Sequence, residues 1–294
     1  MVVQEGVIAL VAICAALTCL LLIYWSWSLG GNSEEISDEG NLTRVRIWYG
    51  DDDRNFVDIY LPSTKRVNLA VVVHGGGFVG GSATGKSAMS MVDFFLKRRF
   101  AAASIEYRVY PSSKWPIPVR DVAAGIKAAF EYLEDRNVKV GKGIYIGSSA
   151  GAIAGALLIY YPDSDLNLSK YFNGFIGLSG GYCSSIAAKK DRVIRTCDTT
   201  LGEMMPFDKD ITPASRVPAL LINGVRDKLL DRFAGEGEVN HQAECMKRFL
   251  EGHGIPVKVV YLPGGHGDPM SKLGAEDPRV VSAIEEFIGL GHGD

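Results

Sequence analysis

Apolar positions along the chain follow two patterns, separated by a polar stretch. Residues 7–27 carry no charge over about 21 positions, and at about 1.5 Å per residue they are long enough to cross a hydrocarbon core of about 30 Å. From residue 44 onward, short apolar runs alternate with longer stretches of helical periodicity. The short runs are typical of buried strands, and the longer stretches are typical of amphipathic helices.

Strands that alternate with helices predict βαβ units and a mostly parallel sheet with helices on both faces. We expect eight strands, of which the first two are joined by a Gly-Asp-Asp-Asp turn and form an antiparallel hairpin. The predicted strands are 44–49, 55–61, 68–74, 101–106, 143–147, 175–179, 219–223 and 257–262. The predicted helices are 87–98, 118–135, 150–160, 238–252 and 278–290.

The same patterns divide the chain into a transmembrane anchor over 1–30, a polar tether over 31–43 and one α/β domain over 44–294. Within the domain, segment 180–218 is long, polar and weakly periodic, and it is predicted to be a lid. Open α/β sheets bind their ligands at the carboxyl ends of the strands. We therefore expect the chemistry in the loops that follow the strands, with the lid above them.

The apolar N-terminal segment has three interpretations: an uncleaved anchor, a cleaved signal peptide or a buried helix of a soluble protein. The third is disfavoured because no polar position marks a solvent face. No lysine or arginine precedes the run, and the run is longer than the usual core of a signal peptide. Tyr24, Trp25 and Trp27 lie at one end, where aromatic rings favour the headgroup layer. These features favour a single-pass anchor.

Composition narrows the classes of function. The chain has 294 residues with 31 basic and 34 acidic side chains. This near-neutral balance lacks the excess of positive charge that is typical of proteins that bind nucleic acid. Its 47% hydrophobic content is typical of a folded protein and excludes a disordered one. The slightly positive mean hydropathy of +0.09 comes largely from the anchor.

The side of the membrane is only weakly indicated. The acidic tether and the glycosylation tripeptides that begin at Asn41 and Asn167 favour a catalytic domain outside the cytoplasm, although such tripeptides are also common by chance. In an oxidising space Cys183 and Cys197 would be able to pair. Two unrelated thiols are an equally good interpretation.

The strongest chemical signal is Gly-Ser-Ser-Ala-Gly at 147–151, between a predicted strand and an apolar helix. A serine hydroxyl becomes a useful nucleophile when a sharp turn holds it beside a base, and small flanking residues permit that turn. Ser149 is therefore the candidate nucleophile. The helix that begins at Ala150 points its free N–H groups at any oxyanion formed there.

A second signal is His-Gly-Gly-Gly-Phe at 74–78, directly after a buried strand. Consecutive glycines let the main chain approach a ligand closely. The N–H groups of Gly76, Gly77 and Ala150 are predicted to form a three-donor oxyanion hole.

The candidate base is His266, because it alone among the five histidines lies in a strand-end loop without belonging to the glycine loop. Asp227 follows the strand 219–223 and is the candidate orienting carboxylate. Asp231, four residues later, is the competing carboxylate, and we prefer Asp227 because it lies nearer the strand end. The order serine, aspartate, histidine is that of an α/β-hydrolase triad.

On these residues the chain resembles a known family. His-Gly-Gly-Gly-Phe at 74–78, Glu-Tyr-Arg-Val-Tyr-Pro at 106–111 and Gly-Ser-Ser-Ala-Gly-Ala at 147–152, with Asp227 and His266, resemble the esterase branch of the α/β-hydrolases. That branch includes hormone-sensitive-lipase-like enzymes, prenylcysteine methylesterases and arylformamidases. The resemblance implies cleavage of a small carboxylic ester through an acyl-enzyme, with no metal or organic cofactor. Ser148 stands where hormone-sensitive-lipase-like enzymes usually have an acidic residue, and only the tether stands where those enzymes carry a helical cap. Both departures favour the side of the prenylcysteine methylesterases and the feruloyl- or aryl-esterases.

Two other classes of function compete with this prediction. Residues 80–87 match the phosphate-binding loop pattern G-x-x-x-x-G-K-[ST] in full, and Lys86 would contact the phosphates. That interpretation leaves Ser149 and His266 without a role. A hydrolase fold that has lost catalysis and acts as a binding module is the second alternative.

Overall fold

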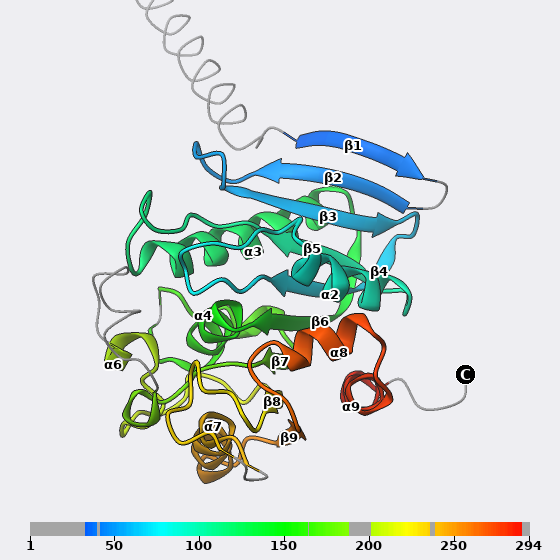
Figure 1. The fold of residues 1–294 in the computed structure, drawn as a ribbon. Helices are drawn as coiled ribbons and strands as arrows, with labels where there is room; N and C mark the ends of the chain where they lie inside the picture. The colour runs from blue at the N-terminus through cyan, green and yellow to red at the C-terminus, as the bar shows by residue number, and fades with distance from the viewer. Residues whose placement is uncertain (1–32, 40–41, 164, 188–200, 236–238, 290–294) are drawn as a thin grey trace, which may run out of the picture.

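The computed structural model of the chain describes residues 33–39, 42–163, 165–187, 201–235 and 239–289 (Figure 1). The anchor predicted over 1–30 lies outside these residues. Among the helices that are described, none has both the length and the apolar character to cross a bilayer.

Within the described part of the chain, nine strands form one sheet in the order β1-β2-β3-β5-β4-β6-β7-β8-β9. The pairs β1-β2, β2-β3 and β3-β5 are antiparallel, and every pair from β5-β4 to β8-β9 is parallel. The strands are β1 (Ser33–Glu39), β2 (Leu42–Trp48), β3 (Phe56–Pro62), β4 (Arg66–Val73), β5 (Ala101–Ile105), β6 (Lys139–Ser148), β7 (Gly174–Leu178), β8 (Ala219–Gly224) and β9 (Val257–Leu262).

Strand β1 corrects the expectation of eight strands. It lies where a polar tether was predicted over 31–43, and it pairs with β2 from Ser33 opposite Ile47 to Glu39 opposite Leu42. An edge strand is held by main-chain hydrogen bonds on one side and needs no apolar run of its own. Its acidic sequence therefore gave no strand signal. The other eight strands lie close to their predicted positions.

Helices cover both faces of the sheet, and together with the strands they bury two apolar clusters. The side chains of β4 alternate between them: Val71 and Val73 belong to the cluster under the first group of helices, and Ala70 and Val72 to the other. The first group is α3 (Ile117–Asp135), α4 (Ala150–Tyr160) and α7 (His241–Gly252); the second is α2 (Lys86–Leu96), α8 (Asp268–Gly274) and α9 (Pro278–Ile288). The parallel strands are thus buried on both sides, as their continuous apolar runs predict.

Helix α8 was not predicted from the sequence, whereas α4 lies where a helix was predicted. Helix α8 begins two residues after His266, in a stretch that carries too few periodic apolar positions to predict a helix. Unlike the amphipathic helices, α4 has no solvent-exposed face, because all of its residues are buried. It lies behind the turn that carries Ser149, so this turn rests on a fully packed element.

The predicted lid over 180–218 is described only at its two ends, since 188–200 lie outside the described residues. The first end contains the 3₁₀ helix η2 (Ser184–Ile186), and the second contains the short helix α6 (Leu201–Met204). The 3₁₀ helix η1 (Ser169–Tyr171) precedes the segment. Isolated bridges join Cys183 to Pro206 and Ala187 to Asp231. The two described ends are therefore joined to each other, and the first is also joined to the connection after β8, while the role of the segment as a lid stays a prediction.

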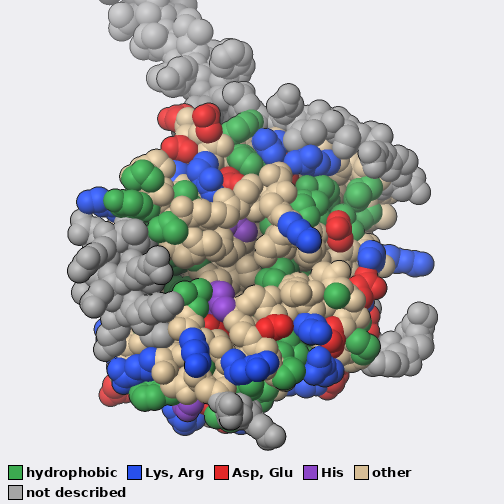
Figure 2. Space-filling view, viewed as in Figure 1, with side chains coloured by type: hydrophobic (Ala, Val, Ile, Leu, Met, Phe, Trp, Pro, Cys, Tyr) green, Lys and Arg blue, Asp and Glu red, His purple; other side chains and the backbone are tan. Residues whose placement is uncertain are grey.

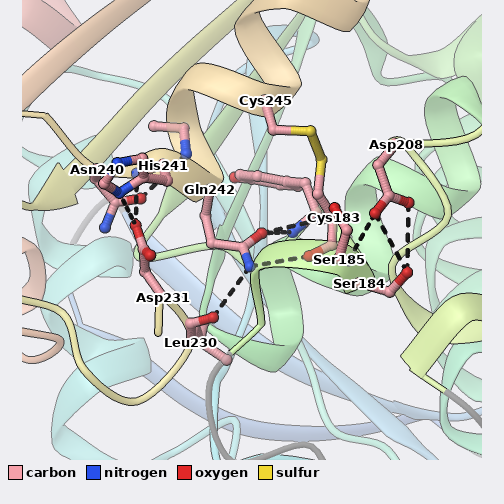
Figure 3. Close-up of a disulfide and its surroundings, with 12 residues drawn as sticks. Cys183, Ser184, Ser185, Asp208, Leu230, Asp231, Asn240, His241, Gln242 and Cys245 are labelled. Atoms are coloured by element: carbon pink, nitrogen blue, oxygen red, sulfur yellow. Dashed lines mark hydrogen bonds and ion pairs between the residues drawn. A yellow bond between two sulfur atoms is a disulfide. The ribbon is translucent and has the colours of Figure 1, made fainter. Parts of the chain in front are cut away.

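A disulfide joins Cys183 to Cys245 of α7 (Figure 3). The pairing of Cys183 with Cys197 that the sequence left open is therefore wrong. Beside the disulfide, the buried side chain of Gln242 uses both of its polar atoms. Its Oε1 accepts from the N–H groups of Tyr182 and Cys183, at 2.7 and 2.9 Å, and its Nε2 donates to the carbonyls of Cys183 and Leu230. The start of the lid segment is thus clamped to α7.

Removal of this disulfide is expected to destabilise the domain. Because the bond closes a sequence separation of 62 residues, Cys245→Ala should lower the free energy of unfolding by about 2–5 kcal/mol. Chemical denaturation under non-reducing conditions measures this change, and Cys197→Ala is the matched control that should leave stability within about 0.5 kcal/mol. A larger loss in the Cys197 variant than in the Cys245 variant would contradict the pairing.

Candidate active site

The turn between β6 and α4 holds Ser149 in a strained main-chain conformation, with φ 50° and ψ −113°. A positive φ at a residue other than glycine is uncommon and is found at functional sites. The two flanking glycines make the turn possible. A Cβ on Gly147 would lie 2.5 Å from the carbonyl of Gly151, and a Cβ on Gly151 would clash with the carbonyl of Val73. The sequence therefore folds into a sharp strand-to-helix turn that presents the serine.

Three side chains from separate loops meet at this turn. His266 Nε2 lies 2.9 Å from Ser149 Oγ, and His266 Nδ1 lies 2.7 Å from Asp227 Oδ2. Asp227 is fully buried, whereas 24% of the His266 side chain is exposed. Figure 2 shows a hollow in the middle of one face, with histidine side chains along it. The structure thus brings together all three side chains that the sequence selected.

Asp227 is held by hydrogen bonds as well as by burial. Its Oδ1 accepts from the N–H groups of Leu229 and Leu230, at 3.0 and 3.3 Å, which leaves Oδ2 for His266. The competing carboxylate, Asp231, faces a different histidine: it accepts from the main-chain N–H and the ring Nδ1 of His241, at 2.5 and 3.1 Å. The geometry resolves the choice between the two aspartates in favour of Asp227.

The glycine loop after β4 lies against the serine turn. A Cβ on Gly75 would lie 2.9 Å from the carbonyl of Ser148, so only glycine permits this approach. Gly76 and Gly77 have φ of 121° and 62°, and a side chain on Gly76 would also clash with the carbonyl of Gly80. Ala150 is the first residue of α4, where a helix has N–H groups without partners. The start of the glycine loop and the N-terminus of α4 thus lie beside Ser149, and the three-donor oxyanion hole stays a prediction.

Comparisons with known proteins agree with the fold. A family model described as BD-FAE matches residues 57–178. The probable isoprenylcysteine alpha-carbonyl methylesterase ICMEL1 of Arabidopsis thaliana is 30% identical over 149 residues, which are 47% of this chain and 31% of that protein. Esterase LipC of Mycobacterium tuberculosis is 26% identical over 275 residues, which are 85% of this chain and 65% of that protein. The chain thus spans about one third to two thirds of the length of these relatives.

Solved structures share the same architecture. A truncated carbohydrate esterase from gut microbiota superposes with a TM-score of 0.63 at 18% identity, over 88% of this chain and 95% of that one. Thermogutta terrifontis esterase 2 phosphoramylated by tabun gives the same TM-score and identity, over 88% and 98% of the two chains. The chain has the α/β-hydrolase fold, and its relatives by sequence are named as esterases.

Sequence reasoning missed two residues that support the site of this α/β-hydrolase. Ser179, directly after β7, donates its hydroxyl to the carbonyl of His266 at 2.6 Å and so steadies the loop that carries the imidazole. Glu106, directly after β5, accepts from His74 Nε2 at 3.1 Å. Both follow strands at the carboxyl edge, and that position is the signal that would have selected them.

The ionisation of Glu106 affects the stability of this α/β-hydrolase. Burial acts to raise the pKa of this carboxyl, but the hydrogen bond and charge of His74, the Ala83 N–H and the Arg54 guanidinium outweigh it and hold the pKa below its ordinary value of 4.5. A depressed pKa in the folded state contributes stability above pH 4.5 that is lost as pH falls through the folded-state pKa.

We therefore expect the melting temperature of the wild type to fall more steeply than that of Glu106→Gln below about pH 4.5. The two curves should converge at acidic pH, because the carboxyl is then protonated in both the folded and the unfolded wild type. Scanning calorimetry from pH 3 to pH 7 measures the difference in melting temperature between the two proteins. A constant gap over the whole range would contradict the assignment.

Residues 80–87, which match the phosphate-binding loop pattern, have main-chain groups that already bond to side chains of the protein. The carboxylate of Glu106 already accepts from the Ala83 N–H at 2.9 Å, so an anion from the protein lies inside the loop. The Ala83 carbonyl accepts from Ser104 Oγ, and Lys86 is exposed. The loop is thus closed on its own chain. As for metals, in the described ranges no three histidine, cysteine, aspartate or glutamate side chains gather as ligands.

Proposed function

We propose that this α/β-hydrolase cleaves a small carboxylic ester through an acyl-enzyme. The observation that carries the proposal is the continuous chain of contacts from Ser149 Oγ through His266 to Asp227, at 2.9 and 2.7 Å. Such distances permit proton transfer from the hydroxyl to the imidazole. The relatives named as esterases support the same reaction class.

In this mechanism Ser149 Oγ attacks the acyl carbon while His266 Nε2 accepts the hydroxyl proton. Asp227 fixes the imidazole tautomer and stabilises the imidazolium. The N–H groups of Gly76, Gly77 and Ala150 bind the tetrahedral oxyanion. His266 then protonates the departing alcohol, and a water molecule repeats the sequence to release the acid and restore the serine.

Hydrolysis of a panel of p-nitrophenyl esters from acetate to octanoate tests this proposal. We expect turnover that is fastest for short acyl chains and unaffected by chelators. ATP hydrolysis that Lys86→Ala abolishes, together with absent esterase activity in the wild type, would support the nucleotide-binding alternative. Absence of both activities would support the non-catalytic binding module.

We further propose that residues 1–30 anchor the protein in a membrane, with the catalytic domain on the extracytoplasmic or lumenal side. The uncharged run over 7–27 supports the anchor. The Cys183–Cys245 disulfide supports the oxidising side, because such bonds persist in oxidising compartments.

Alkaline carbonate extraction and protease protection of intact vesicles test this placement. We expect the full-length protein to stay in the carbonate pellet and its domain to be protected in vesicles that enclose the lumen. Release of a shortened chain that lacks residues 1–30 would instead support a cleaved signal peptide.

A further inference from the structure

Glu106 is a buried carboxylate that the mechanism above does not use. It follows β5 at the carboxyl edge of the sheet, and only 3% of its side chain is exposed. A buried carboxylate is costly unless charged or polar partners surround it. Glu106 has such partners from three different parts of the chain.

Two of these partners lie at the opposite ends of one loop, residues 74–83, which contains the glycines of the predicted oxyanion hole. At the start of the loop, His74 Nε2 donates to Oε1 at 3.1 Å. At its end, the Ala83 N–H donates to Oε2 at 2.9 Å. Arg54 Nη2, from the β2–β3 hairpin, donates to Oε1 at 2.5 Å and to the Gly81 carbonyl at 2.8 Å. One carboxylate thus joins the two ends of the loop.

The His74 ring is fixed on all sides. Its Nδ1 lies 2.7 Å from the Gly75 carbonyl, so both ring nitrogens face acceptors and both donate when the ring is an imidazolium. The ring stacks on Tyr107 with centroids 4.2 Å apart, and the Tyr107 hydroxyl donates to the His74 carbonyl at 2.9 Å. Burial raises the pKa of Tyr107, so this donor stays protonated.

The loop needs this support because its central residues are glycines. Gly76 and Gly77 are exposed and have positive φ, and glycine loses more conformational freedom on ordering than any other residue. An oxyanion hole lowers the barrier only when its donors are already in place as charge develops. The ends of the loop must therefore be held if its centre is to be pre-organised.

We propose that Glu106 is a positioning residue, which joins His74 to Ala83 and so holds the Gly76 and Gly77 N–H groups toward the oxyanion. This role rests on the proposed ester hydrolysis. The carboxylate bonds to the two ends of the loop and not to Ser149, so it acts through the oxyanion donors and hence on the transition state. Loss of the carboxylate should therefore reduce kcat and leave KM nearly unchanged.

The test compares the variant Glu106→Gln with the control variant Asp58→Asn, which alters another buried carboxylate. Asp58 is fully buried and accepts from Arg44 and Arg46 at 2.6 and 2.7 Å, but it lies on β3 and does not contact the glycine loop. Steady-state kinetics with p-nitrophenyl acetate give kcat and KM, and thermal melts give stability. A trifluoromethyl ketone, which forms a tetrahedral adduct with the serine oxygen, measures affinity for a transition-state analogue.

We expect Glu106→Gln to lower kcat by about 10²-fold, with KM within about twofold of the wild type. Affinity for the ketone should fall by the same factor as kcat/KM. Asp58→Asn should keep kcat and ketone affinity within about threefold, even if it melts at a lower temperature. If Glu106→Gln does not fold, Arg54→Gln, which removes one donor from a partly exposed position, should shift the same two quantities in the same direction by a smaller factor.

Unchanged kcat in a folded Glu106→Gln enzyme would overturn the proposal, as would equal losses of kcat in the Glu106 and Asp58 variants. A wild type that turns over no ester would instead refute the proposed function itself. These two failures are distinguishable, because the second is visible before any variant is made.

Discussion

Replacing Ser149 with alanine is expected to lower kcat for p-nitrophenyl acetate by about 10⁶-fold, to the level left by binding and the oxyanion donors. No other hydroxyl takes its place, because the turn at φ 50° presents this one side chain to His266 Nε2. The fold should be retained, since the alanine side chain is smaller and the Ser149 N–H keeps its bond to the Leu178 carbonyl.

The neighbouring Ser148 provides the control for this change. It is buried, lies at the end of β6 and differs from Ser149 by one position, so Ser148→Ala tests loss of a serine hydroxyl without loss of the nucleophile. Stopped-flow measurement of the burst of p-nitrophenol separates acylation from deacylation. If the burst survives in Ser149→Ala but disappears in Ser148→Ala, Ser149 is not the nucleophile.

The second large effect is expected from Asp227→Asn, which should lower kcat by about 10⁴-fold. An asparagine amide turned toward His266 Nδ1 would hold the ring in the wrong tautomer, with its proton facing Ser149. The effect on KM should be small, because the aspartate is buried behind the histidine and does not reach the substrate.

Asp231→Asn is the matched control for this variant. Both aspartates are fully buried, and they lie four residues apart on the same connection after β8. Asp231 contacts His241 at the start of α7, so its replacement should cost stability and leave kcat within about tenfold. Kinetics on both variants over pH 5 to pH 9 check the pair. A larger loss of kcat in the Asp231 variant than in the Asp227 variant would contradict the assignment of Asp227 to the triad.

Much of the fold could be predicted from the sequence, because buried parallel strands appear as short apolar runs and the helices between them as apolar residues at helical spacing. Strand β1 could not, since pairing at a sheet edge depends on the main chain and not on apolar side chains. Helix α8 is short, and its packing against the strands and α2 is a tertiary effect rather than a local one.

Ser149, Asp227 and His266 could be selected from the sequence because each lies in the connection that follows a strand, and parallel strands end at one edge of the sheet. Cys245 could not be paired with Cys183, because it lies inside a helical pattern 62 residues away while Cys197 is nearer in the sequence. Glu106 was visible only as part of a family pattern. Its contacts with His74 and Ala83 arise from adjacent strands and cannot be derived from spacing alone.

Whether Ser149 forms a covalent intermediate can be measured by adduct mapping with a fluorophosphonate probe. The wild-type protein, labelled and digested, should show one modified peptide with the phosphonyl group on Ser149, and an excess of ester substrate should slow its formation. The same probe should leave Ser149→Ala unlabelled. A wild-type protein that carries no adduct, or carries it on another residue, would contradict the account.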